Sequence, residues 1–275
     1  MTSAAPAIAE PTGETIPEDR AHSLFRWNAV LAGLHAIQGL LILALSFARD
    51  PIVTAPVVTS YLSFDEATSS LVQAQRELFE LPIGPAVATF FFMSAIAHAL
   101  LAWPLRAWYE RRLAAGIQPM RWIEYSLSSS VMIVVIAALS GIQEIGTLVA
   151  IFGINAAMNL FGWSMESANQ GRTKVQWNHY VFGVIAGIVP WIVIGIALWS
   201  ASTEPGAEPI PGFVFAIFVT LFLAFNVFAI TMILQYGKIG RWRDYLVGEK
   251  TYMFLSLFAK TLLAWQVFAG TLAPN

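Results

Sequence analysis

Seven long apolar segments, separated by more polar ones, make up the pattern of the chain. A helix that crosses a lipid bilayer needs about 20 mostly apolar residues, and each of the seven segments has roughly that length. The pattern therefore predicts an all-α integral membrane protein, a bundle of seven spanning helices without a separate soluble domain. The predicted spans are residues 24–48, 83–107, 121–143, 146–166, 178–200, 211–236 and 251–270.

Two stretches outside the spans have a character of their own. Residues 1–22 are interpreted as a disordered cytoplasmic tail, because most of them are Ala, Pro, Thr or Glu and they contain no apolar core. The rest of the chain, residues 23–275, is one membrane domain. The long connection 51–81 begins with a β-branched run from Ile52 to Tyr61, which predicts a small structured extracellular loop in the form of a hairpin. Its role is open between an oligomer contact and a simple connector.

The composition agrees with a membrane protein. Hydrophobic residues make up 57% of the chain and charged residues 12%, whereas soluble domains are roughly one quarter charged. The chain has no cysteine, which excludes disulfides and thiolate metal sites. It also has no His-x-x-x-His motif or carboxylate cluster, so we expect no metal site.

The basic residues indicate an orientation. Most of the 15 lysines and arginines lie before the first span or in the second, fourth and sixth connections, which share one side of the membrane. The other side has Arg49 and Arg76 beside a larger number of acidic residues. Since loops rich in Lys and Arg stay in the cytoplasm, we expect a cell-membrane protein whose N-terminus is cytoplasmic and whose C-terminus is extracellular.

One lysine lies in the middle of an otherwise apolar span, and only one acid lies clearly inside a span. Lys260 is in the middle of the last span, and Glu124 is near the start of the third. A charge near the centre of a bilayer costs several kcal/mol, so such residues are usually functional. The depths of the two residues are similar, which predicts an ion pair. In the alternative interpretation, Glu124 lies at the membrane interface and reaches water together with Arg121.

Further polar residues accompany this predicted pair. Ser128 and Ser256 lie one helical turn from Glu124 and Lys260, where they could hydrogen-bond the pair or only allow close helix packing. His35 and His98 lie at similar depths in the first two spans. They could form a proton-accepting cluster, or be two neutral histidines bonded to each other or to water.

The later spans also contain polar and aromatic residues of interest. Asn155, Asn159 and Asn226 could join neighbouring helices. Trp191 lies in the fifth span, and Phe218, Phe222 and Phe225 follow at helical spacing in the sixth. Such a stripe is more often plain packing, but flat rings near a buried lysine also suit a long planar apolar ligand.

A buried lysine has a specific covalent chemistry. Its amine condenses with an aldehyde to a Schiff base, whose protonated form keeps a positive charge that needs a balancing anion. The order of seven spans with a lysine in the last resembles microbial rhodopsins, and five strings resemble one branch of them, the heliorhodopsins. The strings are Trp122–Met132, Ile151–Ala156, Gly187–Trp191, Pro211–Val214 and Ala259–Trp265, and His35 and His98 match the two histidines of that family.

The resemblance implies a cofactor and a role for each residue. It implies that Lys260 carries all-trans retinal, that Glu124 is the counterion, and that Ser128 and Ser256 adjoin the Schiff base. It further implies that His35 and His98 belong to a hydrated cavity on the cytoplasmic side. It also implies a homodimer formed through the first extracellular loop and spans four and five. The residues implied to line the polyene are Tyr125, Met132, Asn155, Phe225 and Trp265.

The buried charges also bear on function. A light-driven proton pump usually needs a second proton-carrying group beyond the first acceptor, and the face of the third span beyond Glu124 has no second acid. We therefore expect a photoreceptor, and no enzyme, whose slow conformational change is read by a cytoplasmic partner; we expect no nucleic acid partner. One alternative is a light-gated or light-driven proton transporter or channel. Another is a structural Lys260–Glu124 pair in a small transporter or enzyme-associated membrane protein.

Overall fold

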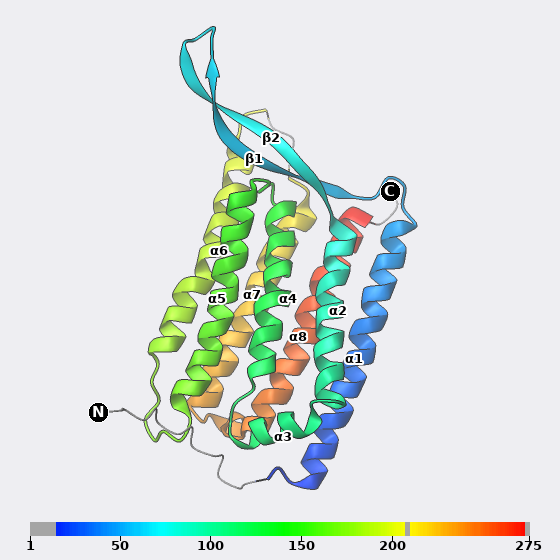
Figure 1. Ribbon diagram of the computed structural model, residues 1–275, viewed down its shortest axis with the longest axis vertical. Helices are drawn as coiled ribbons and strands as arrows, with labels where there is room; N and C mark the ends of the chain where they lie inside the picture. The colour runs from blue at the N-terminus through cyan, green and yellow to red at the C-terminus, as the bar shows by residue number, and fades with distance from the viewer. Residues whose placement is uncertain (1–14, 207–209, 273–275) are drawn as a thin grey trace, which may run out of the picture.

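The computed structural model describes residues 15–206 and 210–272. Within these residues, seven helices are long and apolar enough to cross a membrane, and they pack side by side as one bundle (Figure 1). Each overlaps one predicted span, so the prediction of a seven-helix bundle is confirmed. The helices are α1 (Glu18–Phe47), α2 (Ile83–Ala102), α4 (Pro119–Leu139), α5 (Ile145–Asn169), α6 (Asn178–Thr203), α7 (Gly212–Tyr236) and α8 (Tyr245–Val267).

The first helix begins earlier than the sequence analysis expects. Residues 18–22 belong to α1, so their prediction as part of a disordered tail is wrong; residues 1–14 of that tail lie outside the described residues. Glu18 and Asp19 occupy the first turn, where acidic side chains interact favourably with the helix dipole. Arg20 also pairs with Asp244 just before α8, at 2.7 Å, in a half-exposed contact between the two helix ends.

A short helix lies between the second and third spans. α2 ends at Ala102, before the predicted end of its span, and the chain then forms α3 (Arg106–Ala114) across the end of the bundle (Figure 1). Two residues of α3, Tyr109 and Leu113, have buried side chains. We call this end of the bundle the α3 end. The sequence does not predict this helix, because nine residues rich in arginine carry no spanning signal.

The opposite end of the bundle has the hairpin that the connection 51–81 predicts. Strands β1 (Thr54–Asp65) and β2 (Ser70–Pro82) pair antiparallel from Thr54↔Pro82 to Asp65↔Ser70. At the turn, Asp65 accepts a hydrogen bond from the Thr68 hydroxyl at 2.9 Å. This bond, together with the backbone N–H of Ala67, lowers the pKa of the Asp65 carboxyl.

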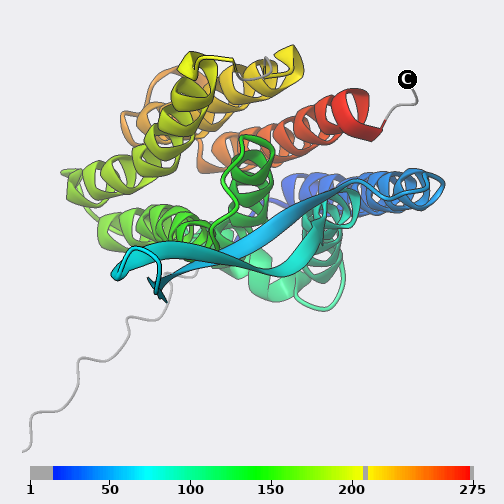
Figure 2. The same cartoon turned by 90° about the horizontal axis from the view of Figure 1, so that it is seen from above.

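The hairpin crosses over the end of the bundle (Figure 2). It is docked there by backbone contacts, because the Val58 N–H donates to the Gln143 carbonyl at 2.9 Å and Val58 forms a parallel bridge with Glu144. Gln143 lies in the connection between α4 and α5. The hairpin therefore ties the α1–α2 connection to the α4–α5 connection, and we call this end of the bundle the hairpin end.

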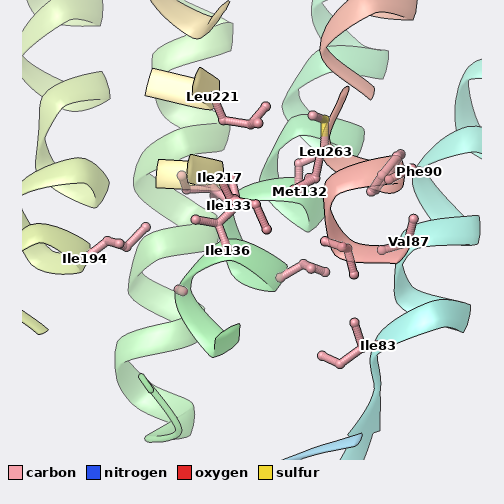
Figure 3. Packing of buried hydrophobic residues seen from close by; sticks show 14 of the residues in the cluster. Ile83, Val87, Phe90, Met132, Ile133, Ile136, Ile194, Ile217, Leu221 and Leu263 are labelled. Atoms are coloured by element: carbon pink, nitrogen blue, oxygen red, sulfur yellow. The ribbon is translucent and has the colours of Figure 1, made fainter. Parts of the chain in front are cut away.

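A cluster of buried aliphatic and aromatic side chains fills the hairpin half of the bundle (Figure 3). The cluster takes residues from the first half of α2 and from the second halves of α4 and α8. These halves lie together because α2 begins at the hairpin end, whereas α4 and α8 run toward it. Interior packing of this kind gains dispersion energy from many close contacts. Members of the cluster include Val87 and Phe90 of α2, Met132, Ile133 and Ile136 of α4, Ile217 and Leu221 of α7 and Leu263 of α8.

Polar side chains join some of the helices. Asn155 of α5 donates to the hydroxyls of Ser129 and Ser130 on α4, at 2.8 and 3.0 Å, and Asn159 also donates to Ser129. These bonds match the expectation that asparagines link helices. Asn226 differs, because its amide donates to the Phe222 carbonyl of its own helix.

Candidate functional site

The predicted ion pair between the two spans is present. Lys260 Nζ of α8 lies 3.3 Å from Glu124 Oε1 of α4, and the two side chains are 3% and 9% exposed. The alternative, in which Glu124 reaches water with Arg121, does not hold, because Arg121 is itself buried and pairs with other acids. Removing one partner of such a buried pair leaves an uncompensated charge and typically costs about 3–5 kcal/mol.

Two serines contact the pair. Lys260 Nζ donates to Ser256 Oγ at 2.7 Å, and Ser94 Oγ of α2 donates to Glu124 Oε1 at 2.6 Å. Ser256 is a predicted contact of the pair, whereas Ser94 is not, because nothing in the sequence places α2 against α4. Ser128 is fully buried, and its hydroxyl has no hydrogen-bond partner among the described residues.

A cavity of about 170 Å³ extends from Lys260 between helices α4 to α8. Most of its wall is aromatic or aliphatic. On α6, Trp191 packs edge-on against Phe222 and Phe225 of α7, with ring centroids 5.4 and 5.5 Å apart. The space suits a long apolar ligand that has a polar group at the Lys260 end.

Two glycines keep this cavity open. A Cβ on Gly162 would overlap the ring of Trp122, and a Cβ on Gly187 would lie 2.5 Å from the sulfur of Met158. All four of these residues line the cavity. Any side chain at the two positions would therefore force one of these neighbours to move.

The structure brings together part of the predicted ligand site. Five of the predicted residues line the cavity: Tyr125, Met132, Phe225, Ser256 and Lys260. Three do not line it: Ser128, Asn155, which bonds to the serines of α4, and Trp265, which is 38% exposed and packs edge-on against Phe268. Glu124 lies beside the cavity through its contact with Lys260.

The two histidines lie together between α1 and α2. Their rings are parallel, with centroids 5.6 Å apart. His98 Nδ1 shares a hydrogen bond with Asn28 Oδ1 at 2.8 Å, whereas neither nitrogen of His35 has a partner among the described residues. The histidines are therefore stacked and not hydrogen-bonded to each other.

A buried charge cluster near the α3 end was missed by the sequence analysis. Arg121 of α4 forms ion pairs with Glu166 of α5 and Glu249 of α8, and its guanidinium lies 4.3 Å from the ring centroid of Tyr252. The expectation that Glu124 is the only acid clearly inside a span is thus wrong. The cause is the position of the helix ends, since α5 continues past Glu166 and α8 begins before Glu249.

One sequence signal could have revealed part of this cluster. The polar residues Tyr245, Glu249, Tyr252, Ser256 and Lys260 follow one another at intervals of three or four. That spacing places them on one face of a helix. Extending the last predicted span to the start of this stripe would have placed Glu249 in the interior with Lys260.

The fold and the site together define a class of protein. Seven spanning helices surround a cavity with aromatic walls, and a lysine of the last helix is paired with a carboxylate of the third, as in the rhodopsin-like membrane proteins. A sequence model of the heliorhodopsin family matches residues 24–272, so the chain belongs to the heliorhodopsin family. A search of curated proteins gave no match. As a member of this family, the chain is a retinal-binding rhodopsin.

Proposed function

We propose that this protein is a light sensor in which all-trans retinal is attached to Lys260, Glu124 is the counterion, and light drives a slow conformational change without ion pumping. The observation that carries the proposal is the buried Lys260–Glu124 pair at one end of the aromatic cavity. The residues fit the cofactor: a buried amine stands at the polar end, and Gly162 and Gly187 leave room along the wall.

Each nearby side chain has a defined part in this proposal. Bound to the Lys260 amine with loss of water, retinal supplies the absorption of visible light and photoisomerisation. Glu124 balances the positive charge on the Lys260 nitrogen and, at 3.3 Å, is close enough to receive a proton from it. Ser94 holds the carboxylate and Ser256 the nitrogen. Trp191 and Phe225 confine the apolar part of the ligand.

The distribution of polar groups around the pair favours a sensor over a pump. A pump needs proton-carrying groups on both sides of the nitrogen. On the hairpin side, the bundle is filled by the apolar cluster, which includes Val87, Met132 and Leu263 and contains no titratable group among the described residues. The histidines and the Arg121 cluster lie on the α3 side. Any proton that moves is therefore expected to leave and return on the same side.

The test of this proposal is the colour of the protein with and without retinal. The wild-type chain should gain a visible absorption band on addition of all-trans retinal, and Lys260→Ala should not. Lys250→Ala is the matched control, because Lys250 is on the same helix but donates to Ser23 at the α3 end. A coloured Lys260→Ala protein would instead favour a purely structural Lys260–Glu124 pair.

A second candidate is light-gated or light-driven proton transport. The stacked histidines in the polar half of the bundle are the observation that favours it, because histidine can carry a proton near neutral pH. Illuminated vesicles distinguish the two candidates. A sustained pH change inside them, abolished by an uncoupler, would establish transport and contradict the sensor proposal.

The proposal includes an orientation and partners. We propose that the α3 end faces the cytoplasm and the hairpin faces outside, because most basic residues lie near the α3 end. We also propose a homodimer through the hairpin, α5 and α6, and a cytoplasmic protein that reads the conformational change. A light-dependent pull-down from cell extract tests for that protein; identical captures in light and dark would count against it.

A further inference from the structure

A second, much smaller cavity lies between the Lys260–Glu124 pair and the Arg121 cluster. Its volume is about 20 Å³. A cavity needs about 10–15 Å³ to hold a water molecule, together with two to four polar partners. Glu124 and His98 are on its wall, and so are Gln118, Arg121 and Glu249 of the charge cluster.

Two atoms of this wall are polar, buried and unpartnered among the described residues. They are Gln118 Oε1, an acceptor, and Arg121 Nε, a donor. Gln118 is 0% exposed and Arg121 is 6% exposed. A buried polar group without a partner costs about 1–3 kcal/mol, and a water in the cavity would provide both atoms with one.

We propose that this cavity binds ordered water that connects Glu124 to Glu249, and that Glu249 is a second proton-handling residue of the protein. The inference rests on the proposed function, in which Glu124 receives a proton after light absorption. The transfer is balanced: the Glu124 O–H gives its proton to the water, and the water gives one of its own protons to the Glu249 carboxylate. The water is unchanged at the end.

The charges of the cluster favour uptake of a proton, and the cavity wall makes Glu249 the group within reach. Arg121 is one cation between two carboxylates, so the cluster carries one excess negative charge in a buried site. Burial of an unbalanced charge is costly. A proton on Glu249 removes that excess, while Glu166 remains to balance Arg121.

Glu166 is a matched control for Glu249. Both are buried and both pair with Arg121, but only Glu249 is on the wall of the small cavity. Both also accept hydrogen bonds from neutral side chains: Glu166 from the indole of Trp122 at 2.8 Å and the hydroxyl of Tyr245 at 2.9 Å, and Glu249 from the hydroxyl of Tyr109 at 2.9 Å. A change that depends on charge balance alone should affect both glutamates equally.

Light-minus-dark infrared spectra of the retinal-loaded protein test the proton transfer. We expect a protonated carboxylic acid band that Glu249→Gln abolishes and Glu166→Gln leaves in place. In flash photolysis, Glu249→Gln should slow recovery of the dark state by about 10²–10⁴-fold, the usual contribution of a positioned proton-transfer group. The same loss of band or the same slowing in Glu166→Gln would overturn the proposal.

A high-resolution structure of the retinal-free protein tests the water itself. We expect density for a water oxygen within hydrogen-bonding distance of Gln118 Oε1, and loss of that density in Gln118→Leu, which keeps both ion pairs of Arg121. A cavity without water density would overturn the proposal. This measurement also separates the water site from the proposed light-sensor function. If the wild-type chain bound no retinal, the proposed function would be contradicted, but the water site could still be tested in the retinal-free structure. If Glu249→Gln does not fold, Gln118→Leu should show the slowed recovery instead.

Discussion

Glu124 is the nearest anion to Lys260 and therefore the residue that most directly controls its charge. In Glu124→Gln, we expect the retinal-loaded protein to absorb at longer wavelength than wild type. The carboxylate favours a positive charge localised at the nitrogen, and without it the energy needed to spread that charge on excitation falls. Absorption spectra of the purified proteins measure this shift.

The control for this substitution is Glu110→Gln on α3. Glu110 pairs with Arg106 at 2.7 Å and lies far from Lys260 in the fold. Its replacement should leave the spectrum unchanged. A Glu124→Gln protein with the wild-type spectrum would show that another group balances the charge.

Gly162 tests whether the cavity holds the ligand. Gly162→Ala should weaken retinal binding, because the new methyl group would overlap Trp122 on the cavity wall and overpacking costs about 1–3 kcal/mol. That range corresponds to roughly 5-fold to 150-fold in affinity. Titration of the apoprotein with retinal, followed at the visible band, measures the change.

The same helix offers a control, since a Cβ added at Gly153 would have no neighbouring atom within 4 Å. Gly153→Ala should bind retinal as wild type does, and should stabilise the helix by up to about 1 kcal/mol. If Gly162→Ala and Gly153→Ala changed the affinity for retinal equally, the width of the cavity beside Trp122 would not limit binding of the ligand.

Some residues of the site could be predicted from the sequence and others could not. Lys260 and Glu124 are visible because each is an isolated charge in an apolar span. Glu249 was missed because an error of one helical turn at a span end removes it from the membrane. Ser94 was missed for another reason: its bond to Glu124 depends on the packing of two helices, which no local pattern encodes.

At the scale of elements, the hairpin exposes several large apolar side chains although it lies outside the spanning helices. Phe64 and Leu71 are register partners near its tip, and both are exposed. If the hairpin contributes to a homodimer, the double variant Phe64→Ser and Leu71→Ser should have half the particle mass of wild type in detergent. Light scattering coupled to size-exclusion chromatography measures the mass.

Glu66→Ser is the control for the hairpin, because it changes an exposed polar residue at the turn. It should keep the wild-type mass. If the double variant also keeps that mass, these two side chains do not hold the dimer together.

The existence of the hairpin could be predicted, but its docking could not. The β-branched run of residues 52–61 indicates strands wherever the rest of the chain lies. The bond from Val58 to Gln143 depends on the distance between two connections that are far apart in sequence. For the same reason, α3 was absent from the prediction: its burial comes from Tyr109 and Leu113 packing under the bundle end.

At the scale of the whole molecule, the orientation is open to a direct test, because the chain has no cysteine. We expect Glu66→Cys to react with a membrane-impermeant thiol reagent on intact cells, and Lys174→Cys to react only after permeabilisation. Both residues are exposed and they lie at opposite ends of the bundle. The reverse labelling pattern would place the hairpin in the cytoplasm.

The contact between Val58 and Gln143 has a consequence for communication across the membrane. It joins the hairpin to the connection that follows α4, the helix that also carries Glu124, so a displacement of α4 would be transmitted to a surface outside the bilayer. By thermodynamic linkage, a molecule that binds the hairpin more tightly in one conformation of the protein must favour that conformation. A ligand bound to the hairpin would then slow or speed up the conformational change that follows light absorption.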